Sequence, residues 1–337
     1  MLLSESTSQE SNVRIISIVG MGGIGKTTLA QMVCDNTRVK THFSKIIWVC
    51  VSSPFNEIRI AKAILESLTN NTPQLIELDP LLQNVSQSII GKKFLLVLHD
   101  VWTEDYRKFE QLNNALSRGA PGSSILVTTR KETVAKVIGT TNNNMFRLGL
   151  LSDEECWSLL SQVAFSGRSS EECKNLKNIG RGIAKRCNGL PLAAKVLGSL
   201  LCFKNTREEW ESVLESELWK VEEAEKVLFP PLLLSYYDLS SLVRRCFSYC
   251  AVFPKAYEMS KDGLIKLWMA QGFFGEIGSR DMEVVGEESF RSLVMRSFFR
   301  DVQYPTWREE ITFKMHDIVH DFAQYLKEDE CSVMEVK

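Results

Sequence analysis

The residues IISIVGMGGIGKTTLA, Ile15–Ala30, are the most informative part of this 337-residue chain for the fold of its first domain. Ile15–Val19 is a short apolar run rich in β-branched residues, which is typical of a buried strand. Gly20–Thr27 follows it directly and matches the pattern GxxxxGK[ST], and from Leu29 onward apolar residues recur at helical spacing. Strand, glycine-rich loop and helix in this order predict a phosphate-binding loop.

The predicted loop supplies several groups that suit a phosphate. Its glycines let backbone N–H groups turn inward, and the helix that follows presents a positive N-terminus. Lys26 can bridge the β- and γ-phosphates, and the Thr27 hydroxyl can bind Mg²⁺. A glycine-rich turn without a ligand is the alternative, which the complete pattern between a strand and a helix disfavours. The predicted nucleotide-binding residues of this segment are Gly20, Met21, Gly22, Gly23, Ile24, Gly25, Lys26, Thr27 and Thr28.

The composition indicates a folded, soluble protein of two or three domains. The chain exceeds the roughly 100–150 residues of an ordinary domain, and 44% of its residues are apolar and 24% charged. Lys plus Arg number 40 against 42 Asp plus Glu, so no net charge draws the whole chain to nucleic acid or to a membrane. No run approaches the roughly 18 apolar residues of a membrane span, and the start MLLSESTSQE does not resemble a signal peptide. We therefore expect a cytoplasmic location.

The nine cysteines are scattered, odd in number and mostly set among apolar residues, which predicts reduced core thiols. Examples are Cys34, Cys50, Cys187 and Cys202. Cys246 and Cys250 lie one helical turn apart, and a metal pair there is the alternative. No second pair with zinc-site spacing accompanies them, so core packing is the favoured interpretation.

Residues 1–146 read as alternating strands and helices. Three further apolar runs, each bounded by polar or glycine residues, resemble buried parallel strands: Ile46–Val51, Phe94–Leu98 and Ile125–Thr129. Between the first two of these runs, apolar residues repeat on one face of a helix: Ile60, Ala61, Ile64, Leu65 and Leu68. The pattern predicts a doubly wound α/β domain with a parallel sheet.

After Phe146 the strand signal ends, and residues 147–228 predict a small helical domain. Its helical stretches are Glu154–Phe165, Leu176–Cys187, Leu192–Phe203 and Glu208–Leu218. Residues 229–337 form the third predicted domain, with more helices, a strand pair and a last amphipathic helix. The strand pair is expected around Ser297–Val302 and Ile311–Lys314.

The segment KKFLLVLHDVW is where a P-loop protein usually has acidic residues for Mg²⁺ and for the attacking water. Here His99 follows the apolar run directly and Asp100 comes next. Asp100 is the candidate for both roles, catalytic residue and Mg²⁺ ligand, although successive strand residues point to opposite faces. Its alternative role is to cap the next turn. A neutral imidazole at His99 is a poor replacement for a carboxylate toward Mg²⁺.

Arg130 ends the stretch SSILVTTR, at the carboxyl end of a predicted strand. Open α/β sheets bind ligands at this edge, so a fixed guanidinium there can detect a γ-phosphate. An exposed Arg in a salt bridge is the alternative.

Several motifs in order resemble the NB-ARC domain of plant intracellular immune receptors, the nucleotide-binding leucine-rich-repeat proteins. The resemblance covers nearly the whole chain and is far more specific than the P-loop alone. WVCVS, Trp102 and CFSYCAVFP resemble the coiled-coil class of these receptors. The motifs are GMGGIGKTTLA, FSKIIWVCVS, KKFLLVLHDVW, GSSILVTTR, FRLGLLSDEECWSLL, CNGLPLAA, CFSYCAVFPKAYEM and MHD.

This resemblance implies a nucleotide-binding α/β domain, a helical domain (ARC1) and a winged-helix domain (ARC2). ADP would keep the three closed, and exchange for ATP would open them and allow homo-oligomerisation. In this sequence Lys26 and Thr27 would hold phosphates and Mg²⁺, and Arg130 would sense the γ-phosphate. Pro191 of GLPL, with Leu192 beside it, would pack near the adenine, and His316 of MHD would reach the β-phosphate of ADP.

The residues alone suggest less for these last motifs. Pro191 lies in a break before a helix. Asp317 fits a helix N-cap, with Ile318, Val319, Phe322, Ala323 and Leu326 as the apolar face of the helix. A metal pair of His316 and His320 lacks a third ligand, which favours a surface or capping role.

The chain departs from the family pattern in two respects. The family has two acidic residues where this chain has His99 and Asp100, which puts Mg²⁺ binding and hydrolysis in question but not phosphate binding. The sequence also begins close to the first strand and ends soon after MHD, without the upstream segment, coiled coil or leucine-rich repeats. We therefore expect a fragment or a truncated receptor, whose natural partners include its own coiled-coil and leucine-rich-repeat domains.

Three functions compete. The first is an ADP/ATP-dependent molecular switch with at most slow ATP hydrolysis. The second is a P-loop enzyme that turns over a substrate, but neither a guanine-reading [NT]KxD motif nor kinase signatures are found. The third is DNA binding through the winged helix, which the near-neutral charge disfavours.

Overall fold

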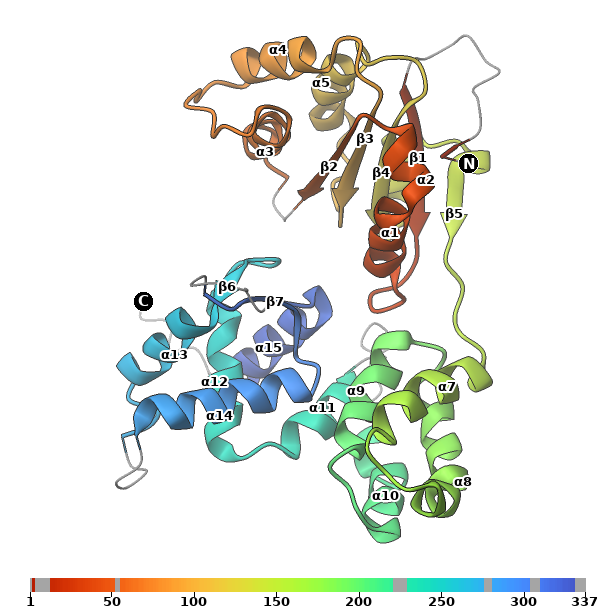
Figure 1. Ribbon diagram of the computed structural model, residues 1–337, viewed down its shortest axis with the longest axis vertical. Helices are drawn as coiled ribbons and strands as arrows, with labels where there is room; N and C mark the ends of the chain where they lie inside the picture. The colour runs from red at the N-terminus through yellow and green to blue at the C-terminus, as the bar shows by residue number, and fades with distance from the viewer. Residues whose placement is uncertain are drawn as a thin grey trace. The chain divides into compact units, whose positions relative to one another are not determined.

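The computed structural model describes residues 2–3, 13–51, 55–220, 229–275, 281–303 and 310–330. The chain divides into two compact units, Met1–Gly149 and Leu150–Lys337 (Figure 1). The first predicted domain, 1–146, ends close to this division. A further division of the second unit at residue 228 borders on residues 221–228, which lie outside the described residues, and stays a prediction.

The first unit contains a five-stranded sheet in the order β2-β3-β4-β1-β5, in which every pair of neighbours is parallel. The four predicted strands are confirmed, and β5 was not predicted because it has only three residues, of which only Met145 is buried. The strands are β1 (Val13–Val19), β2 (Lys45–Cys50), β3 (Phe94–His99), β4 (Ser123–Thr129) and β5 (Met145–Arg147).

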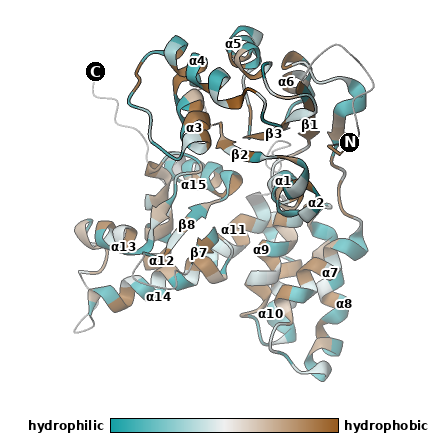
Figure 2. Ribbon diagram, turned by 45° about the horizontal axis from the view of Figure 1, so that its top comes forward, coloured by the Kyte–Doolittle hydropathy of each residue, from teal (hydrophilic) through white to brown (hydrophobic). Residues whose placement is uncertain are grey.

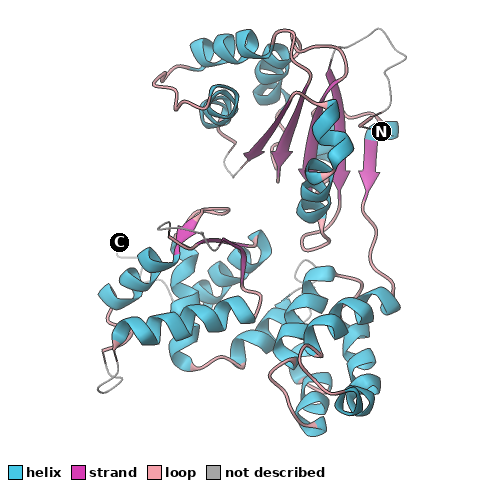
Figure 3. Ribbon diagram, viewed as in Figure 1, coloured by secondary structure: helices cyan, strands magenta, loops and turns pink. Residues whose placement is uncertain are grey.

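Helices cover both faces of this sheet, so the predicted doubly wound α/β fold is confirmed (Figure 3). Alternation along β3 shows the two layers: Leu96 and Leu98 belong to one apolar cluster, Leu95 and Val97 to the other. The first cluster includes residues of α3 to α6, and the second includes residues of α1 and α2. These helices are α1 (Lys26–Asp35), α2 (Thr37–His42), α3 (Glu57–Thr69), α4 (Leu78–Ile89), α5 (Tyr106–Leu116) and α6 (Glu132–Val137).

The second unit is mainly helical, and the predicted helical stretches are confirmed. Capping boxes begin three of its helices, because Ser152, Ser169 and Thr206 each exchange hydrogen bonds with a glutamate three residues later. The helices before the winged-helix region are α7 (Asp153–Ala164), α8 (Ser170–Arg186), α9 (Pro191–Leu201), α10 (Arg207–Leu214) and α11 (Phe229–Tyr237). Most of these helices carry hydrophobic residues beside hydrophilic ones (Figure 2).

The last part of the chain combines four helices with a small antiparallel sheet in the order β6-β8-β7. The predicted strand pair is confirmed as β7 and β8, and Phe247, Phe298, Phe313 and Phe322 are fully buried in this part. Its elements are α12 (Ser241–Tyr249), β6 (Met259–Ser260), α13 (Lys261–Ala270), α14 (Met282–Met295), β7 (Phe299–Gln303), β8 (Thr312–Met315) and α15 (Asp317–Glu330).

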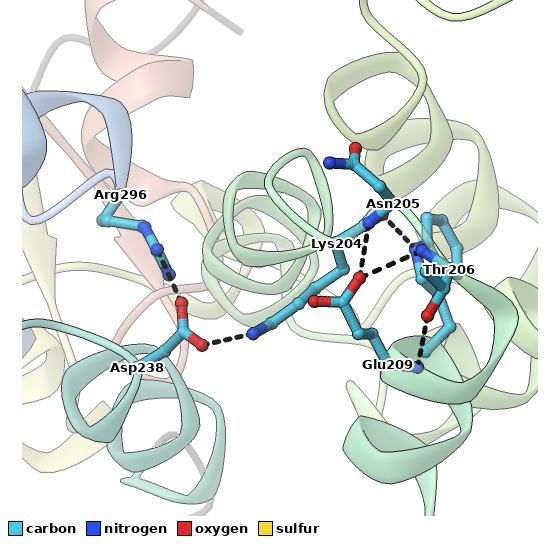
Figure 4. Close-up of polar contacts among 7 residues, drawn as sticks. Lys204, Asn205, Thr206, Glu209, Asp238 and Arg296 are labelled. Atoms are coloured by element: carbon cyan, nitrogen blue, oxygen red, sulfur yellow. Dashed lines mark hydrogen bonds and ion pairs between the residues drawn. The ribbon is translucent and has the colours of Figure 1, made fainter.

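A charged cluster joins the helical part of the second unit to its winged-helix part (Figure 4). The Asp238 carboxylate, just after α11, accepts from Lys204 beyond the end of α9 and from Arg296 at the end of α14, with 2.6 Å to Arg296 Nη2. The Arg296 guanidinium also lies over the Phe203 ring at 4.5 Å. All three charged side chains are largely buried, so the cluster ties together segments far apart in sequence.

The described cysteines are free thiols, as predicted, but only some belong to the core. Cys187, Cys246 and Cys250 are buried, whereas Cys34, Cys50 and Cys202 are half-buried. Burial raises the pKa of Cys246 to about 12, which keeps this thiol protonated and unreactive. Among the described residues no group of three or more His, Cys, Asp or Glu is arranged to hold a metal ion, and no described helix is long and apolar enough to span a membrane.

Candidate nucleotide-binding site

The P-loop joins β1, an interior strand of the sheet, to α1. Gly23 and Gly25 have φ angles of 75° and 100°, the left-handed region that glycine adopts without strain. Gly20 packs closely, since a Cβ there would lie 3.2 Å from the Leu148 carbonyl oxygen. Helix α1 begins at Lys26, and the first-turn N–H groups of a helix have no intrahelical acceptor. The loop therefore presents backbone donors and a positive helix end to an anion.

The Lys26 side chain is buried against its own loop. Its Nζ donates to the carbonyl oxygens of Gly20 at 2.7 Å and Met21 at 2.8 Å, and only 8% of the residue is exposed. These bonds hold the ammonium at the start of the loop instead of letting it extend into solvent. A charge fixed in this way attracts a phosphate without first losing side-chain freedom.

His99 lies against the P-loop helix. Its Nε2 is 2.6 Å from Thr27 Oγ1, and its Nδ1 is 3.4 Å from the Sγ of Cys50, its register partner on β2. The ring stacks on Trp48 with centroids 5.7 Å apart, and His99 is only 3% exposed. The imidazole of His99 thus lies between the P-loop threonine and β2.

Asp100 turns away from the direction of β3. Its φ is 58°, its backbone N–H donates to Thr128 Oγ1 at 2.9 Å, and its carboxylate accepts from the indole Nε1 of Trp102 at 2.8 Å. The carboxylate therefore fixes the following tryptophan, a role related to the turn-capping alternative. Its predicted parts in catalysis and in Mg²⁺ binding stay predictions.

Arg130 follows β4, the strand that pairs with β1. Gly20 N–H donates to Thr129 O at 3.3 Å, so Arg130 and the P-loop begin at the same sheet edge. The guanidinium lies 4.5 Å from the centre of the Trp102 ring. A cation–π contact of this kind helps to orient the half-buried Arg130.

Mg²⁺ is the metal that this fold implies, and the donor set at the ends of β3 and α1 does not suit it. The Thr27 hydroxyl is bonded to an imidazole, no carboxylate directly follows the apolar run of β3, and the Asp100 carboxylate is bonded to Trp102. Mg²⁺ prefers oxygen ligands in near-octahedral geometry.

The remaining predicted site residues belong to the second unit. Pro191 is the first residue of α9, with Leu192 next, and both are half-buried. Gly189 before them has a φ of 73°, and a Cβ there would lie 2.7 Å from the Leu151 carbonyl oxygen. This packing accounts for the glycine of GLPL as a structural residue. A contact of Pro191, Leu192 or His316 with a nucleotide stays a prediction.

The prediction that Asp317 is an N-cap is wrong, because His316 takes this position. Helix α15 begins with Asp317, and the Ile318 N–H donates to His316 Nδ1 at 3.2 Å. Since Nδ1 accepts, a neutral His316 ring carries its proton on Nε2 and is a donor there. The predicted capping role of this histidine is confirmed, and the apolar face of the helix is buried as predicted.

His320 is buried, so it does not lie at the surface, which was one of the two roles predicted for this histidine pair. Its Nε2 is 2.7 Å from the Phe253 carbonyl oxygen, to which it donates. Burial lowers the pKa of His320 below 6.5, which favours the neutral ring.

Sequence reasoning missed Trp48, Cys50 and Thr128 and did not connect Trp102 with Arg130. The pairing of Cys50 with His99 depends on strand order and register. Strand order and register cannot be read from two separate apolar runs, although Cys50 and His99 are the last residues of β2 and β3.

Comparison with known proteins agrees with this architecture. The NB-ARC domain family matches residues 2–170, and the disease resistance protein winged helix domain matches residues 252–323. The disease resistance protein RGA2 of Solanum bulbocastanum is 44% identical over 327 residues, which cover 96% of this chain and 33% of that protein. The disease resistance protein RPM1 of Arabidopsis thaliana is 31% identical over 333 residues, 96% of this chain and 36% of that protein.

A solved structure shares the fold. The crystal structure of a Signal Transduction ATPase with Numerous Domains (STAND) protein with a tetratricopeptide repeat sensor, from Pyrococcus horikoshii, aligns with a TM-score of 0.55 at 17% identity. The alignment covers 94% of this chain and 41% of that one. The chain spans about a third of the length of the curated relatives that it matches.

A P-loop on a parallel sheet, followed by a helical region and a winged helix, defines a P-loop nucleotide-binding protein. Within this class the chain belongs to the NB-ARC family of plant disease resistance proteins. Membership of this family implies nucleotide binding at the P-loop.

Proposed function

We propose that this chain is the nucleotide-dependent switch of a plant intracellular immune receptor. ADP holds the resting form closed, and exchange for ATP opens it and allows assembly into a homo-oligomer. The observation that carries the proposal is the P-loop itself, in which a buried Lys26 and two left-handed glycines present positive charge and backbone donors at the start of α1.

The other predicted residues have distinct parts in this proposal. The loop amides and Lys26 hold the β-phosphate in both states. Arg130, oriented by Trp102, detects the γ-phosphate and so distinguishes ATP from ADP. His316 donates from Nε2 to the β-phosphate of ADP, while Pro191 and Leu192 pack against the adenine.

Such contacts are what a switch requires. A ligand shifts a conformational equilibrium only by the difference in its contacts with the two states. If His316 contacts ADP only in the closed form and Arg130 contacts the γ-phosphate only in the open form, the two nucleotides favour different forms. In the whole receptor the coiled-coil and leucine-rich-repeat domains would act on the same equilibrium.

The alternative is a P-loop enzyme that turns over a substrate with ATP. The sequence contains neither a guanine-reading [NT]KxD motif nor kinase signatures, and the Asp100 carboxylate is bonded to Trp102. We therefore place slow hydrolysis at most in this chain. Direct DNA binding remains disfavoured by the near-neutral charge.

The test is the nucleotide that the protein retains during purification. The protein would be denatured after gel filtration, and the released nucleotide identified by ion-pair chromatography and quantified against protein. The proposal expects ADP at close to one equivalent, with none in Lys26→Ala. An empty wild-type site, combined with ATP turnover that depends on an added acceptor, would favour the enzyme.

A further inference from the structure

We infer that the nucleotide site of this chain binds adenine nucleotide without Mg²⁺, because His99 takes up the threonine hydroxyl that the metal would need. The inference rests on the proposed nucleotide binding and adds to it which chemical form of the nucleotide is bound. It concerns this sequence in particular, since the residue after the apolar run of β3 is a histidine here.

The first step is the contact between His99 and Thr27. At 2.6 Å, the imidazole Nε2 is within hydrogen-bonding distance of the hydroxyl oxygen that a P-loop usually offers to Mg²⁺. Mg²⁺ lies about 2.0–2.1 Å from its oxygen ligands and requires a near-octahedral shell. An imidazole this close to the hydroxyl competes for one of its few bonding directions and occupies space where the shell would lie.

The second step is that His99 is held in this place. It is 3% exposed, its other ring nitrogen lies 3.4 Å from Cys50 Sγ, and its ring stacks on Trp48. Both neighbours belong to β2, which pairs with β3 in register over six residues. Moving the ring away from Thr27 would therefore disturb contacts along two strands.

The third step is that Asp100 does not replace the missing carboxylate. Its left-handed backbone, with φ at 58°, turns the chain directly after β3. Its carboxylate accepts from Trp102 Nε1 at 2.8 Å, and its N–H is bonded to Thr128. If Asp100 bound a metal, it would lose its charge-assisted hydrogen bond with the Trp102 indole. The same indole ring contacts the Arg130 guanidinium.

The absence of bound Mg²⁺ affects nucleotide binding and ATP hydrolysis differently. The charge of the phosphates is met by Lys26, the loop amides and the start of α1, none of which depends on a metal. Retention of ADP therefore continues without Mg²⁺. Hydrolysis of ATP, which in P-loop proteins uses the metal, is slow.

The experiment measures the Kd of ADP and of a non-hydrolysable ATP analogue by isothermal titration calorimetry, in excess magnesium chloride and in EDTA. Wild type is compared with His99→Asp and His99→Asn. The two variants have nearly the same shape, but Asp has a negatively charged carboxylate where Asn has a neutral amide. Circular dichroism confirms the fold of each variant. Single-turnover hydrolysis of ATP in both buffers gives a second readout.

For wild type we expect both dissociation constants to change by less than about twofold between the two buffers. His99→Asn should keep this independence, whereas His99→Asp should bind the ATP analogue about tenfold or more tightly with Mg²⁺ and hydrolyse ATP faster. The wild-type comparison decides the inference even if a variant fails to fold.

Binding by wild type that is about tenfold tighter in Mg²⁺ would overturn the inference and leave the proposed switch intact. No binding of either nucleotide in either buffer would overturn the proposed function and this inference with it.

Discussion

Lys26 makes the most direct test of the P-loop at the scale of a single residue. Lys26→Ala removes the ammonium, and Lys26→Arg replaces a compact charge by a planar guanidinium that does not fit between Gly20 O and Met21 O. Because a charge-assisted hydrogen bond contributes up to about 3 kcal/mol, we expect ADP binding to weaken by about two orders of magnitude in both variants.

The control for this measurement is Lys40→Ala. Lys40 is an exposed lysine that forms an ion pair with Asp35 near the end of the same helix. Its loss should leave the Kd of ADP unchanged by calorimetry. Unchanged affinity in a folded Lys26 variant would show that the P-loop lysine takes no part in binding.

His320 predicts a pH dependence of stability. Burial is the largest cause and lowers the pKa of folded His320 below the unfolded value of 6.5, and the nearby Lys255 lowers it as well. The hydrogen bond to the Phe253 carbonyl and the charge of Asp321 act in the opposite direction. Between the folded pKa and 6.5 the unfolded chain binds more protons than the native one. This group therefore leaves stability intact above about pH 6.5 and reduces it as the pH falls below that value.

The measurement is the melting temperature of wild type and His320→Gln from about pH 7.5 to pH 5. Glutamine keeps a donor for the Phe253 carbonyl but does not titrate. Wild type should lose stability more steeply than the variant below about pH 6.5, where carboxylates are still ionised. Parallel curves would mean that His320 does not titrate differently in the two states.

At this scale the sequence predicts residues that act through their own backbone or a local motif. The P-loop glycines and Lys26 are of this kind. His99 and Asp100 are not, because their partners are Thr27, Cys50 and Trp102, and only Trp102 is a near neighbour in sequence. Whether His316 or Asp317 is the N-cap depends on the residue at which α15 begins. A shift of one residue changes which side chain bonds to the Ile318 N–H.

Among the elements, long and strongly apolar strands were predictable, and short ones were not. Strand β3 is buried along its whole length, so its six residues form a continuous signal. Strand β5 has three residues, two of them exposed, and exists because β1 offers a free edge for pairing. The start of α8 was also missed by six residues, since its first turn is polar and begins at a capping box.

The ion pairs of Asp238 are expected to stabilise the packing of the segments that follow α9, α11 and α14. Asp238→Asn leaves Lys204 and Arg296 without their shared carboxylate, at side-chain exposures of 21% and 10%. These side chains are less exposed than those of a surface ion pair and more exposed than those of a fully buried one. We therefore expect the variant to lower the free energy of unfolding by about 1–3 kcal/mol. Urea unfolding followed by circular dichroism measures it.

Glu154→Gln is the matched control for the Asp238 variant. It removes the carboxylate of an ion pair in the same unit, Arg181–Glu154, whose side chains are 42% and 68% exposed. Surface pairs of this kind contribute little, so its unfolding curve should coincide with that of wild type. Equal effects of the two variants would contradict a special role for the Asp238 cluster.

For the whole molecule, the proposed switch requires that the nucleotide bound at the P-loop also contacts His316. The order of sheet, helical region and winged helix was predictable, because each has its own periodicity and the motifs occur in a specific order. The response of the two units to a nucleotide cannot be predicted from the hydrophobic periodicity of their strands and helices. It depends on a few side chains such as His316, whose Nδ1 caps α15 and whose Nε2 is a donor.

The ratio of ADP to ATP affinity in His316 variants shows whether His316 distinguishes the two nucleotides. Calorimetry would give the Kd of ADP and of a non-hydrolysable ATP analogue for wild type, His316→Ala and His316→Asn. Asparagine can still cap α15 but lacks the ring donor, so it separates nucleotide contact from helix stability. Our expectation is that both variants weaken ADP binding relative to ATP binding by about tenfold, because one charge-assisted hydrogen bond is lost. An unchanged ratio in folded variants would contradict it and leave His316 as a helix cap alone.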